Sequence, residues 1–181
     1  MVATPAELDF LDLAAIQAQT GSPVRSQYRL PGEPRSRPAD AIIVAPATFN
    51  TINKWAQGIS DRCALGLLAE GTAMDVPIVA LPFVNTALAR RAPFRRSVAE
   101  LRWEGVRVML GPGAFEPHPP GAGGEHIDSF PWHIALSEAE QCMAKLTEAR
   151  GEGQPDVALG RLATTGSAMS DSYEPSCRNN P

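Results

Sequence analysis

The chain has 181 residues, of which 44% are hydrophobic and 20% are charged, and its formal net charge is −4. These values are ordinary for a globular domain and exclude wholesale disorder, and the length is enough for one hydrophobic core. The acidic balance argues against a nucleic-acid partner and against binding to an anionic membrane, because both require clustered basic residues.

The first part of the chain predicts a helix, a loop, a strand and a long helix. Residues 6–19 have apolar side chains mainly on one helical face, and Gly21 ends this helix. Residues 22–38 contain four prolines among Arg and Glu, which is typical of a loop. Residues 40–45 predict a buried strand, followed by a helix over 51–70. Five apolar side chains of that helix are spaced for burial, namely Ile52, Trp55, Ile59, Cys63 and Leu67.

The alternation of strand and helix continues in the middle of the chain. Residues 77–81 predict a second strand, residues 94–103 a helix that stops at Gly105, and residues 106–110 a third strand. Strands that alternate with helices are typical of an α/β fold with a parallel sheet. The four arginines of the one basic cluster are interpreted as a solvated helix face, and they are Arg90, Arg91, Arg95 and Arg96.

The last part of the chain is less regular. Residues 111–131 are rich in Gly and Pro and predict no regular structure. Ser137 and Glu140 have capping-box spacing, which predicts a last helix from there to about residue 149. Residues 150–181 contain few large apolar side chains, and we interpret them as a disordered tail after a domain over 1–149.

The sequence also indicates a location. No stretch approaches the roughly 20 apolar residues that cross a bilayer, and the amino terminus lacks the pattern of an export signal. The three cysteines, Cys63, Cys142 and Cys177, are odd in number and lack metal-ligand spacing. We therefore expect a cytoplasmic protein that does not bind membranes and has no disulfide framework.

Similar turns follow the first two predicted strands. Strand 40–45 leads into Thr48, Asn50 and Thr51, and strand 77–81 leads into Phe83 and Asn85. Parallel strands end at one edge of a sheet, where ligands of α/β proteins bind. Free backbone N–H groups and the positive end of a helix favour phosphate there. Each Asn is equally open to a plain interpretation as a helix N-cap.

These residues resemble a known family. Residues 45–54, Ala-Pro-Ala-Thr-Phe-Asn-Thr-Ile-Asn-Lys, with Gly-Ile-Ser-Asp at 58–61, are similar to the Pro-Ala-Ser-Ala-Asn-Thr signature of the homo-oligomeric flavin-containing cysteine decarboxylases, such as phosphopantothenoylcysteine decarboxylase. Residues 82–89 fall where that family has Pro-x-Met-Asn-x-x-Met-Trp. The resemblance extends from about Thr4 to Leu110. It implies a three-layer Rossmann-like (flavodoxin-like) fold with helices on both faces of a parallel sheet.

The resemblance also implies a cofactor, a substrate class and an assembly. These are FMN, a small-molecule or peptide carboxylate, and a homotrimer or a multiple of it, with Trp55, Phe83, Val84 and Leu88 facing a neighbouring subunit. Asn85 is the implied catalytic residue. The implied FMN contacts are Thr4, Ala6, Thr48, Phe49, Asn50, Thr51 and Phe83.

The chain departs from the family pattern at several places. The family begins with a strand and a phosphate-binding turn, whereas residues 1–5 resemble the end of its second strand, so we interpret the domain as N-terminally truncated. The family's catalytic His, which precedes the Asn-Thr motif, has no counterpart in 27–38, and its proton-donating Cys has none in 111–131. Val84, Leu88 and Ala89 replace Met, Met and Trp.

Two functions therefore stay open. Asn50 and Asn85 favour an FMN-dependent enzyme on an unknown carboxylate, whereas the missing His and Cys favour a non-catalytic flavoprotein-fold subunit or regulatory protein. We expect no cysteine decarboxylation at the family's rates unless His118 or His126 folds over the site. We interpret these histidines and His133 as surface residues. We expect no metal, because His118, His126 and Asp128 lack a recognised ligand spacing.

Overall fold

The computed structural model describes residues 1–5, 8–33, 38–127 and 129–152. Its sheet has three parallel strands in the order β1 (Ile42–Ala47), β2 (Ile78–Pro82) and β3 (Arg107–Val108). The predicted parallel α/β sheet is confirmed. The third strand is shorter than predicted, because Leu110 leaves the sheet and forms an isolated bridge with Phe115 across a turn at Gly111.

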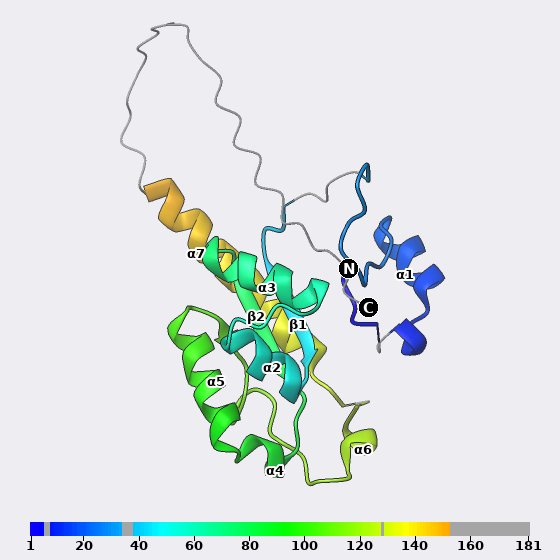
Figure 1. Cartoon of the computed structure of the whole chain (residues 1–181). Helices are drawn as coiled ribbons and strands as arrows, with labels where there is room; N and C mark the ends of the chain where they lie inside the picture. The colour runs from blue at the N-terminus through cyan, green and yellow to red at the C-terminus, as the bar shows by residue number, and fades with distance from the viewer. Residues whose placement is uncertain (6–7, 34–37, 128, 153–181) are drawn as a thin grey trace, which may run out of the picture.

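Helices cover both faces of the sheet (Figure 1). One face packs against α2 (Phe49–Ala56), α3 (Cys63–Ala73) and α5 (Ala92–Trp103), and the other packs against α7 (Trp132–Glu152). Side chains alternate along β2, because successive residues of a strand point to opposite faces. Ile78 and Ala80 belong to the first core, and Val79 and Leu81 to the second. This three-layer arrangement confirms the expected Rossmann-like fold.

The amino-terminal helix is shorter than expected. A 3-10 helix, η1 (Leu8–Phe10), precedes α1 (Leu13–Thr20). Asp12 separates the two, because its side chain accepts a hydrogen bond from the Ala15 backbone N–H at 3.0 Å and so caps a new helix. The predicted end at Gly21 is confirmed, and Gly21 has a φ of 66°.

The helix predicted over residues 51–70 is wrong as a single element, because α2 and α3 are separated by residues 57–62. Gly58 has a φ of 68°, a left-handed conformation that favours glycine and interrupts a helix. Ile59 and Leu67 are each 42% exposed, so the periodicity wrongly placed them in the core. Ile52, Trp55 and Cys63 are buried, as predicted.

Two expectations about the second half are also wrong. Residues 111–131, predicted to have no regular structure, contain a short helix, α6 (Gly123–Ile127). A separate short helix, α4 (Thr86–Ala89), follows β2. Helix α7 begins at Trp132, next to a proline, and not at Ser137. Ser137 lies inside the helix and accepts a hydrogen bond from Gln141 instead of capping. The helix extends through 150–152, and the rest of the predicted tail lies outside the described residues.

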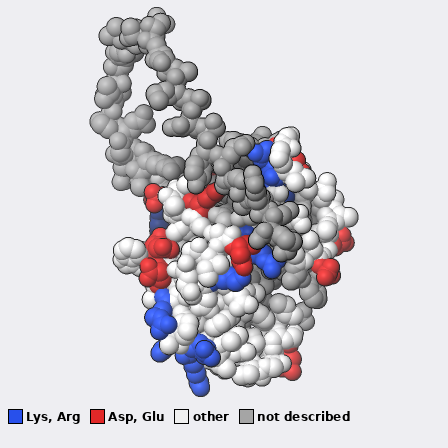
Figure 2. Space-filling view, in the orientation of Figure 1, with Lys and Arg blue, Asp and Glu red and all other residues white. Residues whose placement is uncertain are grey.

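The basic cluster lies on the surface, as expected. Arg90, Arg91, Arg95 and Arg96 are all exposed, and basic side chains gather over the region of α5 in Figure 2. Among the residues that the structure describes, no helix is long and apolar enough to cross a membrane.

Candidate cofactor and catalytic site

The two predicted motifs meet at the edge of the sheet where β1 and β2 end. Helix α2 begins immediately after β1, and α4 begins shortly after β2. The Phe83 backbone N–H donates to the Ala47 carbonyl at 2.9 Å, which ties the two motifs together. Helices α4 and α6 lie at this same end of the molecule (Figure 1). The topology therefore brings together residues that are far apart in the sequence.

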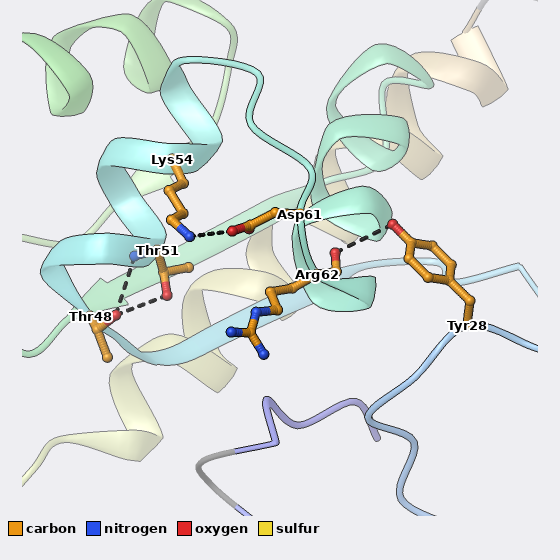
Figure 3. A network of polar contacts seen from close by, with 6 residues as sticks. All are labelled: Tyr28, Thr48, Thr51, Lys54, Asp61 and Arg62. Atoms are coloured by element: carbon orange, nitrogen blue, oxygen red, sulfur yellow. Dashed lines mark hydrogen bonds and ion pairs between the residues drawn. The ribbon is translucent and has the colours of Figure 1, made fainter. Parts of the chain in front are cut away.

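Thr48, and not Asn50, caps helix α2. The Thr48 Oγ1 accepts from the Thr51 backbone N–H at 3.2 Å and lies 2.9 Å from the Thr51 Oγ1 (Figure 3). The Asn50 side chain is exposed, and within the described residues it makes no hydrogen bond. The backbone N–H groups of Phe49 and Asn50 likewise have no acceptor there. Free N–H groups at the positive end of a helix attract an anion or a hydrogen-bond acceptor.

Charged side chains lie near the other end of α2, where Lys54 belongs to the last turn of the helix. Lys54 donates to Asp61, and this hydrogen bond is the main cause that lowers the pKa of Asp61 (Figure 3). Arg62 has no ion pair in the described part of the chain. In Figure 3 its side chain points toward the side of the view where Thr48 and Thr51 are drawn. A guanidinium without an ion pair would favour a negatively charged group. Arg62 could not be selected from the sequence, because the break between α2 and α3 places it there.

Asn85 does act as an N-cap. Its Oδ1 accepts from the Leu88 backbone N–H at 2.9 Å and so begins α4. The Nδ2 group donates no hydrogen bond within the described residues and is available to a ligand. The role of helix N-cap thus uses the side-chain oxygen of Asn85 and leaves its amide N–H groups free.

His118 lies beside Asn85 and is only 8% exposed, so its interpretation as a surface residue is wrong. The Thr86 backbone N–H donates to the His118 carbonyl at 2.8 Å, and Asn85 and His118 form an isolated parallel bridge. The His118 ring lies 5.0 Å from the Phe83 ring and 5.6 Å from the His126 ring, measured between centroids. His126 is half-buried, whereas His133 is exposed as expected. A loop histidine therefore does reach the site.

Phe83 lies at the centre of an aromatic cluster. Its ring is 5.3 Å from the ring of Phe115 and 5.4 Å from that of Phe130, in addition to its contact with His118. Aromatic pairs at such distances stabilise by about 0.5 to 1.5 kcal/mol beyond the area they bury. The cluster holds residues 115–130 against the end of β2.

Other predicted residues lie elsewhere. Trp55 is 4% exposed and Val84 is 2% exposed, and both belong to the first core, so the expectation that they face a neighbouring subunit is wrong. Leu88 is half-buried against the same core. Thr4 is half-buried in the amino-terminal segment, and its role stays a prediction. Ala6 lies outside the described residues.

Two further features are separate from this site. A pocket of about 360 Å³ opens at the opposite end of the sheet, beside Pro77, Val106 and Cys142. Burial raises the pKa of the Cys63 thiol, which makes it a poor nucleophile at neutral pH. The described residues hold no group of three side chains placed to bind a metal, and Asp128 is not among them.

Comparison with known proteins identifies the class of protein. The model of the Flavoprotein family matches residues 11–150, so this chain belongs to the Flavoprotein family. The predicted resemblance is confirmed, and membership of the family supports a flavin as cofactor. A comparison with curated protein sequences gave no match.

Several solved structures share the fold. The FMN-dependent cysteine decarboxylase SpaF is 24% identical, with a TM-score of 0.53 over 77% of this chain and 78% of that one. TvaF, an FMN-dependent cysteine decarboxylase from thioviridamide biosynthesis, is 23% identical, with a TM-score of 0.54 over the same shares. The FMN binding protein AtHal3 is 17% identical, with a TM-score of 0.52 over 86% and 82%. At these identities the likeness establishes the fold.

Proposed function

We propose that this protein binds FMN at the carboxyl edge of its sheet and acts as a decarboxylase-like enzyme, a lyase, on a small-molecule or peptide carboxylate. One observation supports this most directly: the α2 start and the Phe83 to Asn85 segment converge at one edge, next to a buried histidine. The family and the descriptions of SpaF and TvaF as FMN-dependent cysteine decarboxylases favour this cofactor and this substrate class.

The residues at the α2 start fit a phosphorylated flavin. The free N–H groups of Phe49 and Asn50 and the Asn50 amide would donate to FMN oxygens, and Arg62 would attract its phosphate. The hydroxyls of Thr48 and Thr51 lie at the same position. When bound, FMN supplies an acceptor for two electrons, whereas the protein orients the substrate and moves protons.

Asn85 and His118 favour an enzyme over the alternative of a non-catalytic subunit. The alternative depended on the missing family His and Cys, and a buried histidine that could replace the first of them lies beside Asn85 in the fold. The free Nδ2 of Asn85 would donate to the substrate carboxylate and so hold it near that histidine. A non-catalytic role remains as an outcome of the experiments below.

Retention of FMN tests the proposed function. We expect the purified full-length protein, with any upstream coding sequence included, to show visible flavin absorption. Asn50→Asp should weaken its FMN binding by about 10- to 100-fold, because a hydrogen bond to a charged group contributes about 1.5 to 3 kcal/mol. Gln57→Glu adds the same charge at the other end of α2 and should bind FMN as the wild type does. Fluorescence titration measures both affinities. A colourless protein that also fails to take up added FMN would contradict the proposal.

We also propose that the protein is a homotrimer or a multiple of one, as the family resemblance implies. Light scattering should give a mass of about three times that of one chain, or a multiple of that value. The interface must use residues other than Trp55 and Val84, since both are buried within the subunit. A clean monomer at micromolar protein concentration would refute the trimer and leave FMN binding to be judged separately.

A further inference from the structure

We propose that His118 is the proton acceptor of this site and that its Nε2 atom removes a proton from the substrate. This inference rests on the proposed function and adds a catalytic residue in place of the family histidine that the chain lacks. It is supported by the tautomer of the ring, by the position of His118 beside Asn85, and by the enclosure of the ring.

The hydrogen bonding of the ring defines its tautomer. The His118 Nδ1 lies 2.8 Å from the Pro119 carbonyl oxygen. A carbonyl oxygen only accepts hydrogen bonds, so Nδ1 must be the protonated nitrogen and must donate. In the neutral ring Nε2 then has a free lone pair, and it makes no hydrogen bond within the described residues. A histidine oriented through one nitrogen is able to act as a base through the other.

The backbone places the His118 ring on the same side of the extended chain as the Asn85 side chain. The bridge puts the backbones of Asn85 and His118 at strand spacing, about 4.8 Å apart. Val84 points into the first core, so its neighbours Phe83 and Asn85 lie on the opposite side of the extended chain. The Phe83 ring contacts the His118 ring on that side. Asn85 and His118 therefore border the same space.

The surroundings exclude water and still leave an approach to Nε2. Phe83 packs against the His118 ring, and the His126 ring stacks on it with an interplanar angle of 18°. Gly123 lies next to the free nitrogen: a Cβ at this position would be 3.6 Å from the His118 Nε2 and 3.4 Å from its Cε1. The absence of a side chain at Gly123 leaves a space about the size of a methyl group beside this nitrogen.

In the proposed step a proton moves from the substrate to the His118 Nε2. The bond between an acidic hydrogen of the substrate, such as a thiol hydrogen, and its heavy atom breaks, and the electron pair stays on that atom. A new N–H bond forms at the His118 Nε2, while Nδ1–H keeps its hydrogen bond to Pro119. The ring becomes a cation, and the Phe83 ring lies 5.0 Å from it between centroids, within the range of a cation–π interaction. Proton transfer by a positioned group typically contributes about 10² to 10⁴ in rate.

The first test needs no substrate, and its NMR measurement needs no cofactor either. Nitrogen NMR of the histidine side chains in the cofactor-free protein should show His118 with hydrogen on Nδ1 and a bare Nε2, assigned by comparison with His118→Gln. A proton on Nε2 in the neutral ring would overturn the inference. The FMN affinity of His118→Gln should stay within about twofold of wild type, because His118 is proposed to act on the substrate. A loss of tenfold or more would make His118 a cofactor-binding residue instead.

The second test measures chemistry in a single turnover. FMN-loaded protein is mixed with a smaller amount of a peptide that ends in cysteine, and mass spectrometry follows the loss of carbon dioxide and two hydrogens. His118→Gln should slow this loss by about 10² to 10⁴, and His133→Gln, on the exposed face of α7, should not. Added imidazole should partly restore a His118→Gly variant. Equal rates in wild type and His118→Gln, or no turnover by FMN-loaded wild type, would overturn the inference. Absence of bound FMN would instead contradict the proposed function.

Discussion

Replacement of Phe94 by Ala is expected to lower the free energy of unfolding by about 3 to 5 kcal/mol. Phe94 is fully buried in α5, and its ring stacks on that of Phe49 at 5.5 Å. Phe49 is the first residue of α2, so this pair supports the helix start that we propose for FMN. Domains are stable by only about 5 to 15 kcal/mol, and the loss would be a large part of the total.

Urea denaturation followed by circular dichroism measures this effect. Trp103→Ala is the matched control, because Trp103 lies on the same helix and is 83% exposed. It should change the unfolding free energy by no more than about 0.5 kcal/mol. If the two variants were equally stable, the packing of α5 on α2 would be wrong.

Phe83→Ala is expected to release residues 111–131 from the end of the sheet. The ring contacts Phe115, His118 and Phe130 and adds to the packing of Phe115 and Phe130 with Val79 and Leu81 of β2 in the second core. A fully buried Phe→Ala change costs about 3 to 5 kcal/mol, and since Phe83 is half-buried we expect about 2 to 3 kcal/mol. The variant should also bind FMN more weakly, because Phe83 borders the proposed site.

Amide hydrogen exchange separates local from global loss of structure. In Phe83→Ala, exchange should rise by about tenfold or more in residues 111–131, while the amides of β2 stay protected. Phe83→Leu keeps most of the apolar volume and should show a smaller increase. Unchanged exchange in residues 111–131 would mean that Phe83 does not anchor this segment.

Much of the fold could be predicted from local patterns. The apolar runs at 40–45 and 77–81 do correspond to β1 and β2, because a buried parallel strand needs only a short continuous apolar segment. Their order and their shared edge followed from the alternation of strands and helices. The motifs at Thr48 to Thr51 and Phe83 to Asn85 were local as well, and the family match agrees with the resemblance found in them.

Element boundaries and burial were decided by the tertiary structure. Apolar spacing continued across residues 57–62, but Gly58 adopts a left-handed conformation there and leaves Ile59 in solvent. The spacing of Ser137 and Glu140 predicted a helix start, yet the helix already begins beside Pro131, since a capping pattern has no effect inside a helix formed by packing. Trp55 and Val84 looked available to a partner because the sequence does not show that both pack into the first core.

The positions of Asn50 and Asn85 could be predicted from the sequence, whereas the position of His118 was decided by the tertiary structure. The sequence by itself placed Asn50 and Asn85 at the ends of two neighbouring strands, because strand ends and helix starts are local signals. It could not show that Thr48 caps α2 and leaves the Asn50 side chain free, which depends on the backbone geometry of the turn. Nor could it place His118 beside Asn85, since that contact joins distant segments through the hydrogen bond from Thr86 to the His118 carbonyl and through the packing of the rings of Phe83, Phe115 and Phe130.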